Sequence, residues 1–218
     1  MLCRSGNLGS AGCFSFYPTK NITTIEGGMV VTNSKDIAEY IMSARNHGLT
    51  KTLSQRYSIG KPWDYDMRES GYNYRLDEIR SSLGLSQLKR IKKINKLRER
   101  RFEYYNKRLK GIDHITTPSS SSKNDHAYHL YILKVEPNKK ISRDILFKKL
   151  LERGIRTSVH YKPLHMFSAF KKFRKNVADL NNSSQLYDEI ISLPFYPNIS
   201  EKQQDYVVRS IIDIMKNP

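Results

Sequence analysis

The amino-acid sequence predicts an α/β fold, because strand-like and helix-like segments alternate along most of its 218 residues. An apolar strand-like run stands at 27–32, and the longest helical pattern covers 76–109. Beyond about residue 112, shorter strands and helices follow one another, which indicates a smaller α+β domain. Hydrophobic residues make up 38% of the chain, which is compatible with a globular core.

The first half contains one predicted strand, one predicted helix and a long loop. The glycine pair at 27–28 allows the backbone to turn into the strand at 27–32. Ser34 is expected to cap the helix that follows. That helix would carry one apolar side, formed by Ile37, Tyr40, Ile41 and Ala44. Residues 47–70 are polar, aromatic and rich in turn formers, so we expect a long ordered loop there.

The stretch 76–109 is expected to form two helices or one bent helix. Its apolar face recurs at steps of three and four residues. The residues of that face are Leu88, Ile91, Ile94 or Asn95, Arg98, Phe102, Tyr105 and Leu109. Serine-rich composition then predicts a loop at 116–124.

The second half is expected to contain two strands, at 128–135 and 155–159. Ser142 precedes a helix that should stop at Gly154. We expect a further helix to start at Ser183 or Ser184 and to end near residues 193–194. Ser200 should cap the last helix, whose inward residues are Val207, Ile211, Ile212 and Met215.

The chain is strongly basic, with 38 Lys+Arg against 21 Asp+Glu and a formal net charge of +17. These charges are densest at 89–110, where they fall on the polar sides of the predicted helix. A solvated helix face explains them best, and the scatter of the other basic residues argues against nucleic acid as a partner. A basic cleft also attracts an anionic substrate. No run approaches a membrane span and none resembles a signal peptide, so the expected location is cytoplasmic.

Lys20 is the strongest candidate for a catalytic residue. It lies in an aromatic, hydroxyl-rich segment, between Phe14 and Glu26, that is closed by the glycine pair. Such a setting suits a lysine that forms an imine with a carbonyl cofactor, because aromatic walls favour the unprotonated, nucleophilic amine. Ser15, five positions earlier, offers a hydroxyl that can donate to a phosphate. An ordinary surface lysine beside a strand is the alternative for the residue taken alone.

The segment around Lys20 reads SFYPTKN at 15–21 and is followed by EGG at 26–28. It resembles the Schiff-base segment of the DegT/DnrJ-type sugar nucleotide aminotransferases, a family of fold-type-I enzymes that use pyridoxal 5'-phosphate. Further similar motifs follow in the family's order: RNHG at 45–48, GYNYRLDE at 71–78, GLSQL at 84–88, HAYHLY at 126–131, GIRTSVHYKPLH at 154–165 and LPFYP at 193–197. The likeness runs from about Gly9 to the end of the chain.

The resemblance implies a reaction and a set of site residues. The reaction is transfer of an amino group from an amino acid, with glutamate expected, to a nucleotide-linked keto sugar in polysaccharide biosynthesis. Lys20 would be catalytic, and Ser15, Lys20 and Asn73 would bind the cofactor, Asn73 reaching the site of a neighbouring subunit in a homodimer. His160, Tyr161 and His165 would line the sugar pocket. The five-residue spacing of the two histidines suits no helical metal pair, so we expect no metal site.

The resemblance also implies a division into two domains, and it implies that the N-terminal part of the family's enzymes is missing from this chain. Residues 1–112 would be the end of the large cofactor-binding domain, and 113–218 the small domain. Family members carry their lysine near the middle of a much longer chain, after the aspartate that meets the pyridine nitrogen, so this chain looks like a C-terminal portion. One alternative is a non-catalytic remnant or partner subunit of such an enzyme. Another is the sugar dehydratase branch of the same fold, in which a histidine replaces the lysine; the presence of Lys20 argues against this branch.

Overall fold

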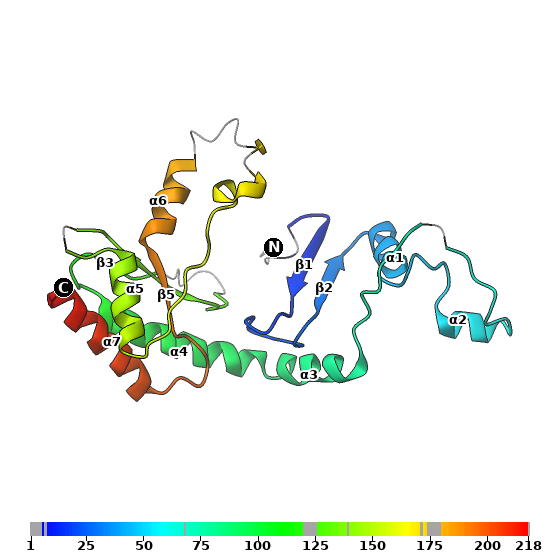
Figure 1. Cartoon of the computed structure of the whole chain (residues 1–218). Helices are drawn as coiled ribbons and strands as arrows, with labels where there is room; N and C mark the ends of the chain where they lie inside the picture. Colours follow the sequence, from blue (N-terminus) through cyan, green and yellow to red (C-terminus); the bar gives the residue numbers. More distant parts are fainter. Residues whose placement is uncertain are drawn as a thin grey trace. The chain divides into compact units, whose positions relative to one another are not determined.

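A computed structural model describes residue 6 and residues 8–67, 69–119, 126–138, 140–170, 172–173 and 180–217. The chain divides into two compact units, 1–91 and 92–218 (Figure 1). This division lies before the boundary near residue 112 that the sequence suggested. The reason is that the basic helix at 91–109 packs its apolar face into the core of the second unit. No helix among the described residues is long and apolar enough to cross a bilayer.

The first unit begins with an antiparallel hairpin. Strand β1 (Ala11–Ser15) pairs with β2 (Gly28–Thr32), in a register that sets Ala11 opposite Thr32 and Ser15 opposite Gly28. The predicted strand at 27–32 is therefore confirmed as β2, and its partner β1 is an element that the sequence did not indicate. The hairpin loop holds residues 16–27, so Lys20 lies between two paired strands.

Helix α1 (Lys35–Ala44) follows β2 and confirms the cap predicted at Ser34, whose side chain accepts a hydrogen bond from Ile37 N at 3.4 Å. The expectation of a loop throughout 47–70 was wrong, since α2 (Leu53–Ser58) interrupts it. Thr52 and Gln55 form a capping box there. A threonine followed three residues later by glutamine is a signal for the start of a helix. The aromatic and turn-forming residues around it favoured a loop instead.

The helical stretch forms two helices, as predicted: α3 (Glu78–Leu88), capped by Asp77, and α4 (Ile91–Leu109). The buried residues of α4 confirm the C-terminal part of the predicted apolar face, namely Arg98, Phe102, Tyr105 and Leu109. Arg98 is buried because its guanidinium donates hydrogen bonds to the carbonyls of Tyr128 and His129.

The second unit contains a three-stranded antiparallel sheet in the order β3 (Ile115–Thr116), β4 (Tyr131–Val135), β5 (Ile190–Leu193). Strand β4 confirms the strand predicted around 128–135, and it alternates buried and half-buried residues. A second expectation was wrong: α6 (Asn181–Glu189) ends before residue 190, and β5 follows it. The run Ile-Ile-Ser-Leu forms a strand because all four residues are buried beside β4.

Residues 155–159 form no strand, against expectation, because only Ser158 pairs with a neighbour, through a single bridge to Ser192. The short helix η1 (Leu164–Met166) lies further along this connector. Of the loop predicted at 116–124, residues 120–124 lie outside the described residues.

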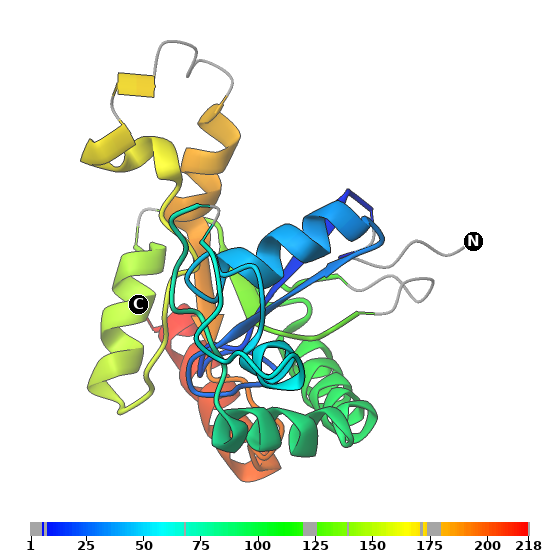
Figure 2. The same ribbon diagram turned by 90° about the vertical axis from the view of Figure 1, so that its right-hand side faces the viewer.

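Helices α5 (Arg143–Glu152) and α7 (Glu201–Lys216) lie side by side in the second unit (Figures 1 and 2). Their predicted serine caps are both confirmed: Ser142 caps α5 and Ser200 caps α7. The hydrophobic core between the helices and the sheet includes Tyr105, Tyr131, Leu133, Leu146, Leu150, Val208, Ile211 and Ile214, all fully buried.

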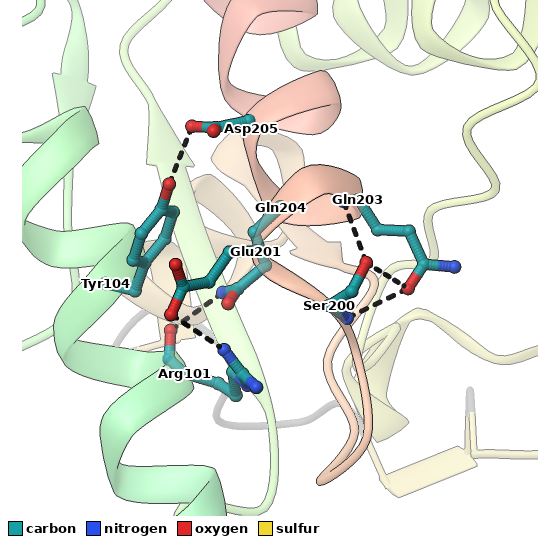
Figure 3. A network of polar contacts seen from close by, with 7 residues as sticks. All are labelled: Arg101, Tyr104, Ser200, Glu201, Gln203, Gln204 and Asp205. Atoms are coloured by element: carbon teal, nitrogen blue, oxygen red, sulfur yellow. Dashed lines mark hydrogen bonds and ion pairs between the residues drawn. The ribbon is translucent and has the colours of Figure 1, made fainter.

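Polar contacts attach the first turns of α7 to α4 (Figure 3). The Tyr104 hydroxyl donates to Asp205 at 2.7 Å, and Gln204 Nε2 donates to the carbonyl of Arg101 at 2.9 Å. Arg101 also pairs with Glu201 at 3.6 Å. The hydrogen bond to Asp205 raises the pKa of Tyr104 because it stabilises the protonated phenol. These contacts fix the position of α7 along α4.

Glu189, only 6% exposed at the end of α6, is a buried carboxylate with two polar partners. Its carboxylate accepts a hydrogen bond from Gln185 at 2.9 Å and pairs with Lys134 at 3.2 Å, and these contacts lower its pKa below the ordinary 4.5. A lowered folded-state pKa means that this contribution to stability is complete above pH 4.5 and is lost as the pH falls through the folded-state pKa.

We therefore expect Glu189→Gln to make the free energy of unfolding less dependent on pH under acidic conditions. As the pH falls below about 4.5, the free energy of unfolding should decrease less steeply in the variant than in the unmodified chain. Urea unfolding at stepped pH measures this slope. Glu152→Gln is the matched control, since Glu152 is exposed and makes no ion pair with any described residue. Equal slopes for Glu189→Gln and the unmodified chain would contradict the assignment.

Candidate functional site

The loop that carries Lys20 is closed by hydrogen bonds of its own backbone. Phe16 N donates to the carbonyl of Gly27 at 2.9 Å, which continues the pairing of β1 and β2 by one step. Lys20 N donates to the carbonyl of Tyr17 at 2.9 Å and Thr24 N to that of Phe16 at 3.0 Å. The lysine therefore lies on a tight turn with a defined backbone path.

Glycine at position 27 is required by the packing of this loop. A Cβ there would lie 2.3 Å from Thr24 Oγ1, a distance that no real contact allows. Thr24 is itself 2% exposed, and its hydroxyl donates to the carbonyl of Glu26 at 2.9 Å. Glycine in the EGG motif thus allows the end of the loop to pack against Thr24.

Helix α3 contributes a residue to this loop that the sequence did not reveal. Gln87 Nε2 donates to the carbonyl of Thr23 at 2.7 Å, and Thr23 N donates to Gln87 Oε1 at 3.2 Å. One side-chain amide thereby holds both polar groups of a backbone unit three residues after Lys20. Gln87 belongs to the GLSQL motif, so two separate motifs of the sequence meet here within the first unit.

Lys20 and Ser15, the two predicted cofactor residues of the hairpin, lie in the hairpin loop and at the end of β1. The Lys20 side chain is half-buried, and within the described ranges its ammonium makes no ion pair. Ser15 ends β1, and its Oγ accepts from Tyr17 N at 3.4 Å, so its proton can be donated elsewhere. The expected aromatic wall does not form from these residues alone, because Phe14 is 44% and Tyr17 49% exposed.

Asn73 lies on an extended segment that pairs with the RNHG turn. His47 N donates to the carbonyl of Tyr72 at 2.9 Å, and Tyr74 N donates to that of Arg45 at 2.8 Å. The side chain of Asn73 is exposed, and its Oδ1 accepts from Arg75 Nε at 2.9 Å. The structure thus brings together two motifs that sequence reasoning treated separately.

Close backbone contact explains why both segments contain glycine. A Cβ on Gly71 would lie 2.1 Å from Gly48 N, and one on Gly48 would lie 1.9 Å from the carbonyl oxygen of Glu69. Gly48 also has a φ of 72°, in the left-handed region that glycine tolerates best. The paired glycines were the available signal for this contact.

We expect Gly71→Ala to separate the two segments. The clash involves backbone atoms and should cost about 1–3 kcal/mol, so the amides of Tyr72 and Tyr74 should exchange with solvent about tenfold faster or more. Hydrogen exchange followed by mass spectrometry or NMR measures this. Gly9→Ala is the control, because the nearest atom to its Cβ would be 3.8 Å away. Unchanged protection in Gly71→Ala would contradict the contact.

The predicted sugar-binding residues lie in the second unit, on the connector between α5 and α6. His160 Nδ1 lies 2.8 Å from Ser192 Oγ, and His165 Nε2 lies 2.8 Å from Ser184 Oγ. Tyr161 is 66% exposed, and its ring meets the imidazole of His160 edge-on. The connector is thus fixed by β5 and α6, while the proposed cofactor residues belong to the first unit.

Comparison with known proteins identifies relatives of this chain. It is 33% identical over 211 residues to the UDP-4-amino-4,6-dideoxy-N-acetyl-beta-L-altrosamine transaminase of Campylobacter jejuni, covering 97% of this chain and 54% of the relative. It is 36% identical to the spore coat polysaccharide biosynthesis protein SpsC of Bacillus subtilis, covering 97% and 55%. The chain therefore spans about half the length of the curated relatives it matches.

Solved structures agree with these relatives. The Helicobacter pylori aminotransferase PseC, involved in the biosynthesis of pseudoaminic acid, matches with a TM-score of 0.86 and 30% identity, over 96% of this chain and 54% of that one. A candidate sugar aminotransferase of Streptococcus pneumoniae, Spr1654, in its PMP form matches with a TM-score of 0.87 and 26% identity, over 98% and 55%. The same protein is also solved in a PLP form. The model of the DegT/DnrJ/EryC1/StrS aminotransferase family matches residues 3–212, and this chain belongs to that family.

Proposed function

We propose that this chain supplies the lysine-bearing part of an enzyme that transfers an amino group from an amino acid, with glutamate expected, to a nucleotide-linked keto sugar. The observation that carries the proposal is Lys20, half-buried and without an ion pair in the described structure, on a turn of the hairpin loop that follows Ser15. The Campylobacter transaminase and the Bacillus spore coat protein support sugar or surface polysaccharide biosynthesis as the setting. A cytoplasmic location remains a prediction.

The residues present fit pyridoxal 5'-phosphate, the cofactor of this family. When bound, it supplies an electron sink for the bond changes at the substrate carbon. Ser15 would donate its hydroxyl proton to a phosphate oxygen, which suits a donor at the end of a strand. Lys20 would hold the cofactor through its aldehyde carbon and, once the substrate amine has displaced it, its free amine would move a proton to and from the substrate carbon.

The remaining predicted residues would act from other parts of the assembly. Asn73 would present its side-chain Nδ2 to the cofactor phosphate of a partner subunit in a homodimer, since Arg75 already occupies its Oδ1. His160, Tyr161 and His165 would contact the sugar nucleotide from the second unit. The positive net charge of +17 favours approach of this anionic substrate.

An activity assay tests the proposal. Because the chain matches about half of its relatives, it would be mixed with a polypeptide carrying the part of the Campylobacter jejuni transaminase outside the match. With pyridoxal 5'-phosphate, glutamate and a UDP-linked 4-keto sugar, we expect formation of the amino sugar and of 2-oxoglutarate. Absence of both products from a sample whose two polypeptides co-purify would count against the proposal.

A second candidate is a non-catalytic remnant or partner subunit, and the surface of the first unit favours it. Every buried hydrophobic residue of the described structure belongs to the second unit, while Met29, Trp63 and Ile79 of the first unit are more than half exposed. Exposed apolar side chains of this kind mark a surface that suits contact with another polypeptide.

We therefore expect the isolated chain to show no stable absorbance band with pyridoxal 5'-phosphate. Spectrophotometric titration of the purified chain measures this directly. A stoichiometric band that disappears in Lys20→Ala and persists in Lys61→Ala, a change of an exposed lysine in the same unit, would exclude the remnant reading.

A further inference from the structure

Ser192 holds the segment that leads to His160 through both its backbone and its side chain. Ser192 N donates to the carbonyl of Ser158 at 2.7 Å, and Ser158 N donates to that of Ser192 at 3.1 Å. The side-chain oxygen of Ser192 lies 2.8 Å from His160 Nδ1. With the Tyr161 ring packed edge-on against the imidazole, His160 is held in one orientation.

The burial of Ser192 decides the direction of this hydrogen bond. The residue is 4% exposed in the middle of β5, and among the described residues His160 Nδ1 is the partner of its hydroxyl. If Nδ1 carried a proton and donated it, the hydroxyl proton of Ser192 would be buried without an acceptor. The hydroxyl therefore donates to Nδ1, and the proton of the neutral imidazole lies on Nε2.

His165, five positions after His160 on the same connector, shows the opposite arrangement. The Ser184 hydroxyl donates to the carbonyl of Leu180 at 3.3 Å, so towards His165 Nε2 it acts as an acceptor. The Nε2 proton of His165 is therefore directed to α6, and its Nδ1 holds a lone pair. The two histidines are fixed by two serines that play different roles.

We infer that Ser192 is a positioning residue that keeps the proton of His160 on Nε2 and so makes this histidine a hydrogen-bond donor. The consequence for substrate rests on the proposed function: His160 would meet an oxygen acceptor of the sugar nucleotide, either the keto oxygen or a phosphate oxygen.

Long-range proton–nitrogen correlation NMR of the full chain tests the inference before any substrate is added. At a pH where the imidazole is neutral, His160 should show a protonated Nε2 and an unprotonated Nδ1, with its signals assigned through His160→Gln. Ser192→Ala should lose this single-tautomer pattern and shift both nitrogens, whereas Ser192→Thr, which keeps the hydroxyl, should retain it. A protonated Nδ1 in the unmodified chain would overturn the inference.

Ser184→Ala is the matched control, because it removes a serine hydroxyl from the other histidine. It should change the nitrogen signals of His165 and leave those of His160 in place. If Ser192→Ala leaves the His160 nitrogens unchanged, Ser192 does not position the ring. Should that variant fail to fold, the tautomer of the unmodified chain still decides. The NMR measurement of the tautomer does not depend on enzyme activity. Failure of the aminotransferase assay and failure of the tautomer assignment are therefore separate results.

Discussion

Lys20→Ala should lower the rate of amino transfer by about 10³-fold or more in the two-polypeptide assay, because one residue supplies both the nucleophile and the proton transfer. Lys20→Arg should be equally inactive, since a guanidinium keeps the positive charge but is not deprotonated in proteins. The steady-state rate of amino sugar formation measures both variants. Loss of rate in both would separate nucleophile chemistry from a simple need for charge.

The control for this result is Lys61→Ala, which removes an exposed lysine from the same unit. Its rate should stay close to that of the unmodified chain. A Lys20→Ala rate within a few-fold of the control would show that Lys20 is not the catalytic amine.

Leu150→Ala should destabilise the second unit by about 2–5 kcal/mol, the usual cost of removing a fully buried leucine side chain. Leu150 is 0% exposed on α5, in the core that α5 forms with α7 and the sheet. Its neighbour Leu151 is 52% exposed, so Leu151→Ala should cost less than about 1 kcal/mol. Urea unfolding followed by circular dichroism measures the difference. Similar losses in both variants would contradict the placement of the core.

The elements predicted best are those whose ends carry a local signal. Ser34, Ser142 and Ser200 each stand before an amphipathic helix, and each caps one in the structure. The boundary between α6 and β5 was missed because Ile190 and Ile191 continue an apolar pattern that fits a helix as well as a strand. Only pairing with β4 decides between them, and a single sequence does not show such pairing.

The candidate site was also predicted where its residues are neighbours in the sequence and missed where they are far apart. Lys20, Ser15 and the glycine pair are neighbours in the chain, so their motif shows them together. The contact of Gln87 with Thr23 joins residues 64 positions apart, and that of Asn46 with Asn73 depends on two glycines in distant segments. Neither contact has a periodicity that a sequence pattern would show; the two glycines mark the second contact, but only the folded chain shows that they meet.

Reduction by borohydride in the presence of pyridoxal 5'-phosphate tests the central role of Lys20 most directly. The chain would be mixed with the complementary part of the Campylobacter transaminase, reduced, digested and mapped by mass spectrometry. We expect one pyridoxyl group per chain, on the peptide that contains Lys20, and none on that peptide in Lys20→Ala. A label spread over exposed lysines such as Lys61, with Lys20 unmodified, would contradict the account.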